Sequence, residues 1–140
     1  MSGLQAALGI SQLERADELV EKKRVNAKFY NSFLKELADE GKITLPPEKP
    51  WAKNVYWMYS ILIEPSFGVS RDELMKLLAK DGIETRTMFI PMHQQPIYKE
   101  KDSYPVADML SQKGLNLPSS TMLKPEEIMY ICEKIKSHAK

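Results

Sequence analysis

The first 45 residues contain no proline, and this constrains the fold more than any other feature of the sequence. Over residues 2–37, apolar positions recur at alternating intervals of three and four, which predicts one long helix with an apolar stripe. The stripe runs through Leu13, Ala16, Val20, Lys23, Ala27, Tyr30, Leu34 and Leu37. Such a helix would be about 54 Å long at roughly 1.5 Å per residue, longer than a compact domain of this size is wide. We therefore expect part of it to reach beyond its own domain, with Gly9 as the alternative site of a break or kink.

The remaining sequence alternates between strand and helix patterns. The predicted elements after Gly41 are a proline-rich connector at 45–50, a strand at 55–64, a helix between Ser70 as N-cap and Asp81, a strand at 83–90, a loop at 91–101, a short helix at 105–112, a short strand at 115–117 and a helix from Pro125. This order predicts an α+β fold, in which a small three-stranded sheet is covered by helices. Residues 41–140 would form this small domain, and residues 1–40 would form a long linker helix leading in from outside.

Composition excludes several classes of function. The charges nearly balance, with 20 Lys and Arg against 19 Asp and Glu, so a nucleic-acid partner is not expected. His93 and His138 lie far apart, and no cluster of Cys and His has metal-ligand spacing, so no metal site is expected. Cys132 is the only cysteine, which favours a cytoplasmic protein, and it lies on the apolar face of the last predicted helix as a buried thiol. No targeting segment and no apolar run long enough to span a membrane are found.

Residues 86–98 form the one segment with a concentration of chemically useful side chains. Arg86, His93 and Tyr98, together with two glutamines, surround a proline-bounded loop that follows a predicted strand. The alternative is a surface loop in which His93 caps a helix or satisfies a backbone carbonyl, and in which Arg86 pairs with Glu84 or Asp72. The sequence has neither a glycine-rich phosphate loop nor a hydrolase nucleophile motif, so no self-sufficient active site is expected.

Several motifs in the same order resemble the C-terminal part of the DegT-type sugar aminotransferases. They are SGLQAALG at 2–9 with QLE at 12–14, WMY at 57–59, GIETR at 82–86, FIPMH at 89–93 and LNLP at 115–118. The resemblance covers nearly the whole chain. It implies enzymes that use pyridoxal phosphate (PLP) to transfer an amino group, usually from glutamate, to a keto group on a nucleotide-linked deoxysugar. Within the family, the sequence is most similar to the perosamine synthases, which act on GDP-4-keto-6-deoxymannose.

The resemblance also implies which functional residues this chain carries. In the family, the PLP lysine, the carboxylate beside the pyridine nitrogen and most phosphate contacts lie in a larger N-terminal domain, which would precede Met1. No catalytic, cofactor-binding or metal-binding residue is therefore expected here, and the chain alone should not hold PLP. Arg86 and His93 match positions where the small domain faces the nucleotide-sugar, and Phe89, Met92 and Tyr98 match positions that shape that pocket. Trp57 and Tyr59 alternate on a predicted strand, so we expect core or sheet-face roles for them.

Two functions are compatible with these observations. The first is the substrate-recognition domain of a PLP-dependent sugar-nucleotide aminotransferase, inactive alone and present as a piece of a longer enzyme or as a shortened gene product. The second is a non-catalytic homologue that acts as an interaction module through its long apolar helix. In either case the opening apolar residues Leu4, Leu8 and Ile10 predict a homo-oligomer that forms through this helix.

Overall fold

A four-stranded antiparallel sheet lies at the centre of the structure, a computed structural model that describes residues 2–98 and 102–140. The order across the sheet is β1 (Ile43–Thr44), β2 (Tyr59–Ile63), β4 (Gly114–Leu117) and β3 (Arg86–Thr87). The two central strands pair from Tyr59 opposite Leu117 to Leu62 opposite Gly114. The predicted α+β fold is confirmed, but the expected count of three strands was wrong. The missed strand, β1, has only two residues and is too short to produce an alternating pattern.

Two predicted strands are shorter than expected. The strand expected at 55–64 begins only at Tyr59, because Tyr56 has a φ of 48°, which a β-strand does not tolerate. Trp57 therefore lies outside the sheet and is 68% exposed, whereas Tyr59 is buried, so the prediction of a core or sheet-face role was right only for Tyr59. The strand expected at 83–90 is reduced to β3.

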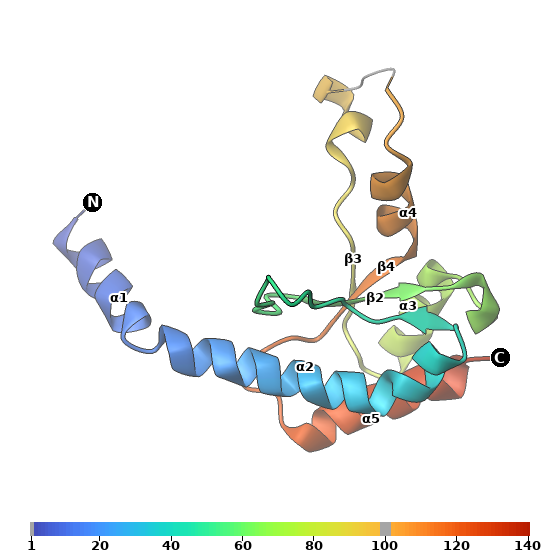
Figure 1. Ribbon diagram of the computed structural model, residues 1–140, viewed down its shortest axis with the longest axis horizontal. Helices are drawn as coiled ribbons and strands as arrows, with labels where there is room; N and C mark the ends of the chain where they lie inside the picture. Colours follow the sequence, from blue (N-terminus) through green and yellow to red (C-terminus); the bar gives the residue numbers. More distant parts are fainter. Residues whose placement is uncertain (1, 99–101) are drawn as a thin grey trace.

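The predicted long helix is divided into two. Helix α1 (Gly3–Leu13) and helix α2 (Ala16–Asp39) meet at an angle, as Figure 1 shows, and the break lies at residues 14–15 rather than at Gly9. Arg15, the N-cap of α2, has φ −110° and ψ 4°, and its side chain makes no capping hydrogen bond. No residue of α1 is buried, whereas α2 buries Ala27, Tyr30, Leu34 and Leu37. These are four of the eight positions on the predicted stripe, and the other four, nearer the N-terminus, are not buried.

Three further helices complete the fold: α3 (Arg71–Lys80), α4 (Pro105–Lys113) and α5 (Pro125–His138). The Ser70 hydroxyl accepts a hydrogen bond from the backbone N–H of Glu73, which confirms the predicted N-cap. Helices α2 and α5 run side by side along the sheet (Figure 1). Among the residues that the structure describes, no helix is both long enough and apolar enough to span a membrane.

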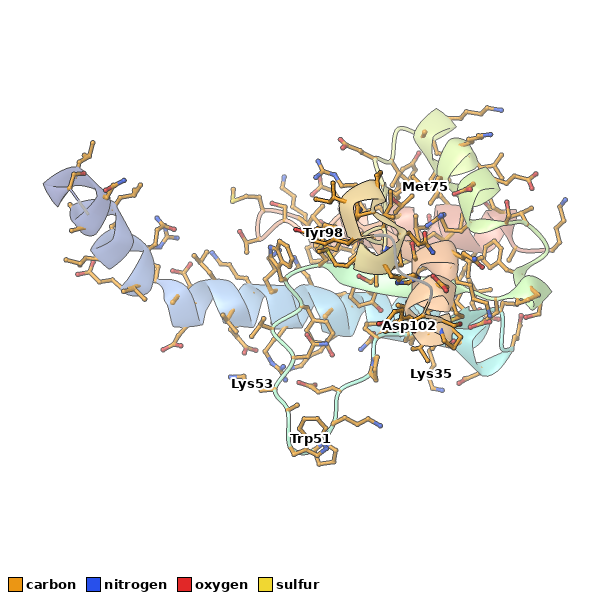
Figure 2. All side chains as sticks on the ribbon, turned by 90° about the horizontal axis from the view of Figure 1, so that it is seen from above. Lys35, Trp51, Lys53, Met75, Tyr98 and Asp102 are labelled. Atoms are coloured by element: carbon orange, nitrogen blue, oxygen red, sulfur yellow. The ribbon has the colours of Figure 1, made fainter. Side chains whose placement is uncertain are left out.

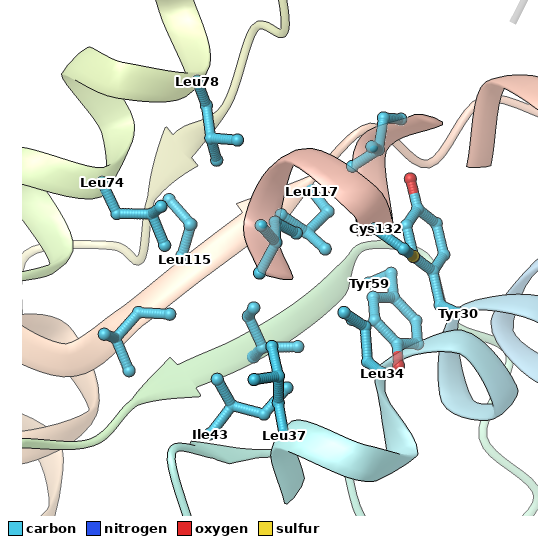
Figure 3. Close-up of a cluster of buried hydrophobic side chains, with 14 of the residues drawn as sticks. Tyr30, Leu34, Leu37, Ile43, Tyr59, Leu74, Leu78, Leu115, Leu117 and Cys132 are labelled. Carbon is cyan, nitrogen blue, oxygen red and sulfur yellow. The ribbon is translucent and has the colours of Figure 1, made fainter. Parts of the chain in front are cut away.

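The core is built around two tyrosines. The rings of Tyr30 and Tyr59 stack with centroids 4.5 Å apart, and the Tyr30 hydroxyl donates to the carbonyl of Pro118 at 2.9 Å. Figure 3 shows Cys132 of α5 beside this pair, with Leu34 and Leu37 on the same side of the core. Cys132 is buried, as predicted, and burial raises the pKa of its thiol to about 12.

Two segments project from this core. Residues 88–98, called the arm below, rise from β3 beside α4 (Figure 1) and contain two short 3₁₀ turns, Met92–Gln94 and Pro96–Tyr98. The segment that begins with the proline-rich connector and continues past residue 50 forms the second projection, and Figure 2 shows Trp51 at its tip and Lys53 on one side of it. The arm carries most of the residues that the sequence singled out, so the candidate site lies outside the core.

Candidate functional site

The arm and the start of α4 line an open pocket of about 450 Å³, called the arm pocket below. Its lining residues are Pro91, Met92, His93, Tyr98, Tyr104 and Ala107. Three residues predicted for substrate binding, Met92, His93 and Tyr98, therefore lie together. The short turns of the arm bring them together, because each turn reverses the backbone within three residues.

His93 has two defined contacts in the arm pocket. Its Nε2 lies 2.9 Å from Oδ1 of Asp108 on α4, and its ring centroid lies 4.8 Å from that of Tyr104 at an interplanar angle of 39°. Only 14% of its side chain is exposed. The partner of this imidazole is thus a carboxylate, rather than a helix end or the backbone carbonyl of the alternative interpretation. Because an ionised carboxylate only accepts hydrogen bonds, we assign the hydrogen to Nε2.

Arg86 and Phe89 lie apart from these residues. Neither lines the arm pocket, and Phe89 is 72% exposed. Arg86 has 76% of its side chain exposed, and its Nη2 lies 3.5 Å from Oε1 of Glu84, an equally exposed partner. This contact agrees with the predicted surface pairing to Glu84, and an exposed pair of this kind contributes little to stability. The arginine therefore remains accessible to an anionic ligand.

A second cavity, called the sheet cavity below, has a volume of about 690 Å³ and lies between β3, the end of β4 and the first turns of α5. Its apolar lining includes Met58, Ile83, Leu117, Leu123 and Ile131. Its charged lining is formed by Glu84, Arg86, Glu126 and Glu127. Of the residues predicted to bind substrate, Arg86 thus lines the sheet cavity, and three others line the arm pocket.

Sequence reasoning missed Asp108 and Tyr104, the two residues that hold the His93 ring. Both lie at the start of α4, where Asp108 is in the first turn. A carboxylate is common in the first turn of a helix, because the helix dipole stabilises its negative charge. The sequence position of Asp108 therefore gave no reason to assign it to a functional site. Only the return of the chain beside the arm brings Asp108 to His93.

Neither of these two cavities fits a PLP site. Neither the arm pocket nor the sheet cavity is lined by a lysine among the residues described. Lys23 is partly buried, and this burial lowers the pKa of its ammonium group. However, that ammonium donates to the carbonyls of Trp57 and Ser119, so it serves to tie α2 to two loops. A Schiff-base lysine needs a free amine that faces the cofactor. Among the described residues, no group of three or more His, Cys, Asp or Glu could hold a metal ion either.

Solved structures of aminotransferases contain a part with a similar fold. PseC of Helicobacter pylori, an aminotransferase involved in the biosynthesis of pseudoaminic acid, is similar in structure with a TM-score of 0.80. It is 25% identical, and the match covers 96% of this chain and 36% of that one. Residues 1–136 match the DegT/DnrJ/EryC1/StrS aminotransferase family, and the chain belongs to this family. The resemblance inferred from the sequence motifs is thereby confirmed.

Two relatives with assigned activities are GDP-perosamine synthases. GDP-perosamine synthase of Escherichia coli O157:H7 is 39% identical over 136 residues, which is 96% of this chain and 35% of the relative. GDP-perosamine synthase of Vibrio cholerae is 36% identical over 141 residues, which is 99% of this chain and 37% of the relative. The chain thus spans little more than a third of the length of these relatives.

Proposed function

We propose that this chain is the substrate-recognition part of a PLP-dependent sugar-nucleotide aminotransferase whose substrate is GDP-4-keto-6-deoxymannose. The observation that carries the proposal is the identity of 39% and 36% to two GDP-perosamine synthases over nearly the whole chain. Residues 41–140 would form the small domain, and residues 1–40 would connect it to the remainder of the enzyme. Because neither the arm pocket nor the sheet cavity fits PLP, the proposal assigns no step of amino transfer to this chain.

The proposed binding residues have separate tasks. Arg86 is permanently charged, and its planar guanidinium suits a diphosphate. His93 and Tyr98 offer polar atoms to a ligand in the arm pocket, where Met92 provides apolar surface. Phe89 is exposed on the arm between these positions and would cover part of a bound ligand.

A domain exchange tests this function. The matching segment of the E. coli O157:H7 GDP-perosamine synthase is replaced by this chain, and PLP loading is measured by visible absorbance. Amino transfer from glutamate to GDP-4-keto-6-deoxymannose is then assayed, with all residues numbered as in this chain. We expect the chimera to load PLP and to aminate the sugar. His93→Ala and Arg86→Ala should each raise KM about 10-fold while PLP absorbance stays unchanged.

The matched control is Lys35→Ala, which removes a surface charge on α2 that pairs with Asp39, far from the arm. It should leave KM unchanged. A chimera that loads PLP but does not aminate the sugar nucleotide contradicts the proposed substrate. A loss of PLP absorbance in the His93 or Arg86 variant contradicts the assignment of these residues to the substrate side.

The exposed apolar face of α1 favours a second candidate function, that of a non-catalytic interaction module. Leu4, Leu8, Ile10 and Leu13 are all exposed. These side chains would bind a partner protein or a second copy of the chain. The genomic sequence upstream of Met1 separates the two functions: an in-frame continuation with a PLP lysine supports the aminotransferase, and a start site at Met1 supports the module.

A further inference from the structure

One carboxylate fastens the arm to α4. Oδ1 of Asp108 lies 2.9 Å from Nε2 of His93 and 2.5 Å from Nε2 of Gln94, which donates to it. Both nitrogens belong to the 3₁₀ turn Met92–Gln94, whereas Asp108 lies in the first turn of α4. A single oxygen thus receives two hydrogen bonds from the arm, and Figure 1 shows the arm and α4 rising side by side. No other described carboxylate is hydrogen-bonded to the arm turn Met92–Gln94.

This contact determines how the imidazole is presented. With Nε2 committed to Asp108, Nδ1 is the ring nitrogen left for a ligand, since no hydrogen bond joins it to any of the described residues. The Tyr104 ring packs against the imidazole and limits its rotation. Most of the arm is more exposed than His93: Ile97 is 81% exposed, whereas 14% of the His93 side chain is exposed.

We propose that Asp108 is a positioning residue, which holds the His93 ring so that Nδ1 faces the nucleotide-sugar in the arm pocket. The proposal rests on the function proposed above, in which His93 touches the substrate. Its physical basis is pre-organisation: a ring that is already held in place loses less conformational entropy when the ligand binds. Asp108 itself is well placed for this task, because the N-terminus of α4 stabilises its negative charge.

The chain offers an internal control for a spectroscopic test. It has only two histidines, and His138 Nε2 also lies 2.8 Å from an aspartate oxygen, Oδ2 of Asp81. In ¹⁵N-labelled protein, a ring N–H that is hydrogen-bonded to a carboxylate exchanges slowly and gives a resolved signal. We expect two such signals, assigned with His138→Ala. Asp108→Ala should remove the His93 signal alone, and Asp81→Ala should remove the His138 signal alone.

The variant Asp108→Asn tests whether the hydrogen bond to His93 is what matters, because it keeps an acceptor oxygen and a side chain of the same size. Its amide oxygen can still accept from Nε2–H, so the His93 signal should persist, at reduced intensity. Should the His93 signal survive Asp108→Ala unchanged, Asp108 does not hold the ring and the proposal is overturned.

Kinetics in the chimera test the consequence for the substrate. Asp108→Ala should raise KM about 10-fold with little change in kcat or PLP absorbance, and Asp108→Asn should restore most of the loss. The matched control, Asp81→Ala, breaks the same kind of pair elsewhere and should leave KM unchanged.

The outcomes distinguish this proposal from the proposed function. If His93→Ala raises KM and Asp108→Ala does not, the positioning role is overturned while the proposed function stands. If neither variant raises KM, although Asp108→Ala removes the His93 signal, then His93 does not bind the substrate and both proposals are overturned. If His93→Ala and Asp108→Ala raise KM by similar factors and Asp108→Asn has a KM near that of the wild type, both proposals are supported.

Discussion

Raising the pH should destabilise the fold through the Cys132 thiol. Because burial raises its pKa to about 12, the native state keeps this proton at pH values where the unfolded chain, with its usual thiol pKa near 9, has lost it. The stabilisation is therefore fully present below pH 9 and is lost as the pH rises toward 12. Each pH unit in this window removes up to about 1.4 kcal/mol, so about 2 kcal/mol is lost by pH 10.5.

The two core tyrosines add to this effect at higher pH. Burial raises the pKa of both Tyr30 and Tyr59 above the usual value near 10, so each contributes in the same direction once the pH exceeds 10. The combined loss is a large part of the roughly 5 to 15 kcal/mol that stabilises an ordinary domain. We therefore expect alkaline unfolding well below pH 12.

Urea unfolding followed by far-UV circular dichroism, with a non-thiol reductant present, measures this loss. Wild type and Cys132→Ala are compared at pH 7.5, 8.5, 9.5 and 10.5. The tyrosines are common to both proteins, and burial, the largest cause of their raised pKa, acts in both, so the difference reports mainly on the thiol. The difference in free energy of unfolding should be constant up to pH 8.5 and should then shift by about 2 kcal/mol against the wild type by pH 10.5. A difference that stays constant over the whole range would refute the reasoning about the thiol.

Three further predictions follow from separate features. Gly114→Ala should cost about 1 to 3 kcal/mol in urea unfolding, because the new Cβ would lie 2.5 Å from the carbonyl oxygen of Leu110 and 2.0 Å from Cγ of Met88; an unchanged midpoint contradicts this. Replacing Leu4 and Leu8 by lysine should shift the sedimentation of the chain toward the monomer, since both side chains are exposed apolar surface, and a wild type that is already monomeric at high concentration rules out self-association. After incubation with PLP and dialysis, borohydride reduction should show no stoichiometric, single-site lysine adduct, because exposed lysines are mostly protonated at neutral pH.

Periodicity predicted the helical side of the core well. In the last helix, Cys132 is buried as predicted, and the isoleucines that share its face, Ile128, Ile131 and Ile135, are buried with it. The reason is that a helix presents the same face every three to four residues. A helix that is buried on one side therefore has apolar residues at that spacing in the sequence. The break between α1 and α2 could not be predicted in this way. Neither Glu14 nor Arg15 is a glycine or proline, and the apolar stripe continues through Leu13 and Ala16 without interruption.

The segment that contains the candidate site could be predicted from the sequence, but the arrangement of its residues in space could not. The sequence identified Arg86, His93 and Tyr98 by their chemical groups, yet it gave no sign that the arm would separate Arg86 from the other two. It also gave no sign of Asp108, because a pair formed by tertiary packing between a loop and a helix leaves no periodic trace. Such pairs depend on where the chain returns after the arm, and local propensity does not encode that path.

The packing of α2 against α5 has a consequence for synthesis on the ribosome. The apolar face of α2, with Tyr30 and Leu34, is synthesised well before the helix that covers it, which begins only at Pro125. At a synthesis rate of roughly 5 to 20 residues per second, this face stays exposed for about 5 to 20 s before α5 is made. During that interval the nascent chain displays a continuous apolar stripe, which is the kind of surface that general chaperones bind. The fold therefore closes late, and a ribosome that stalls before Pro125 leaves α2 exposed to aggregation.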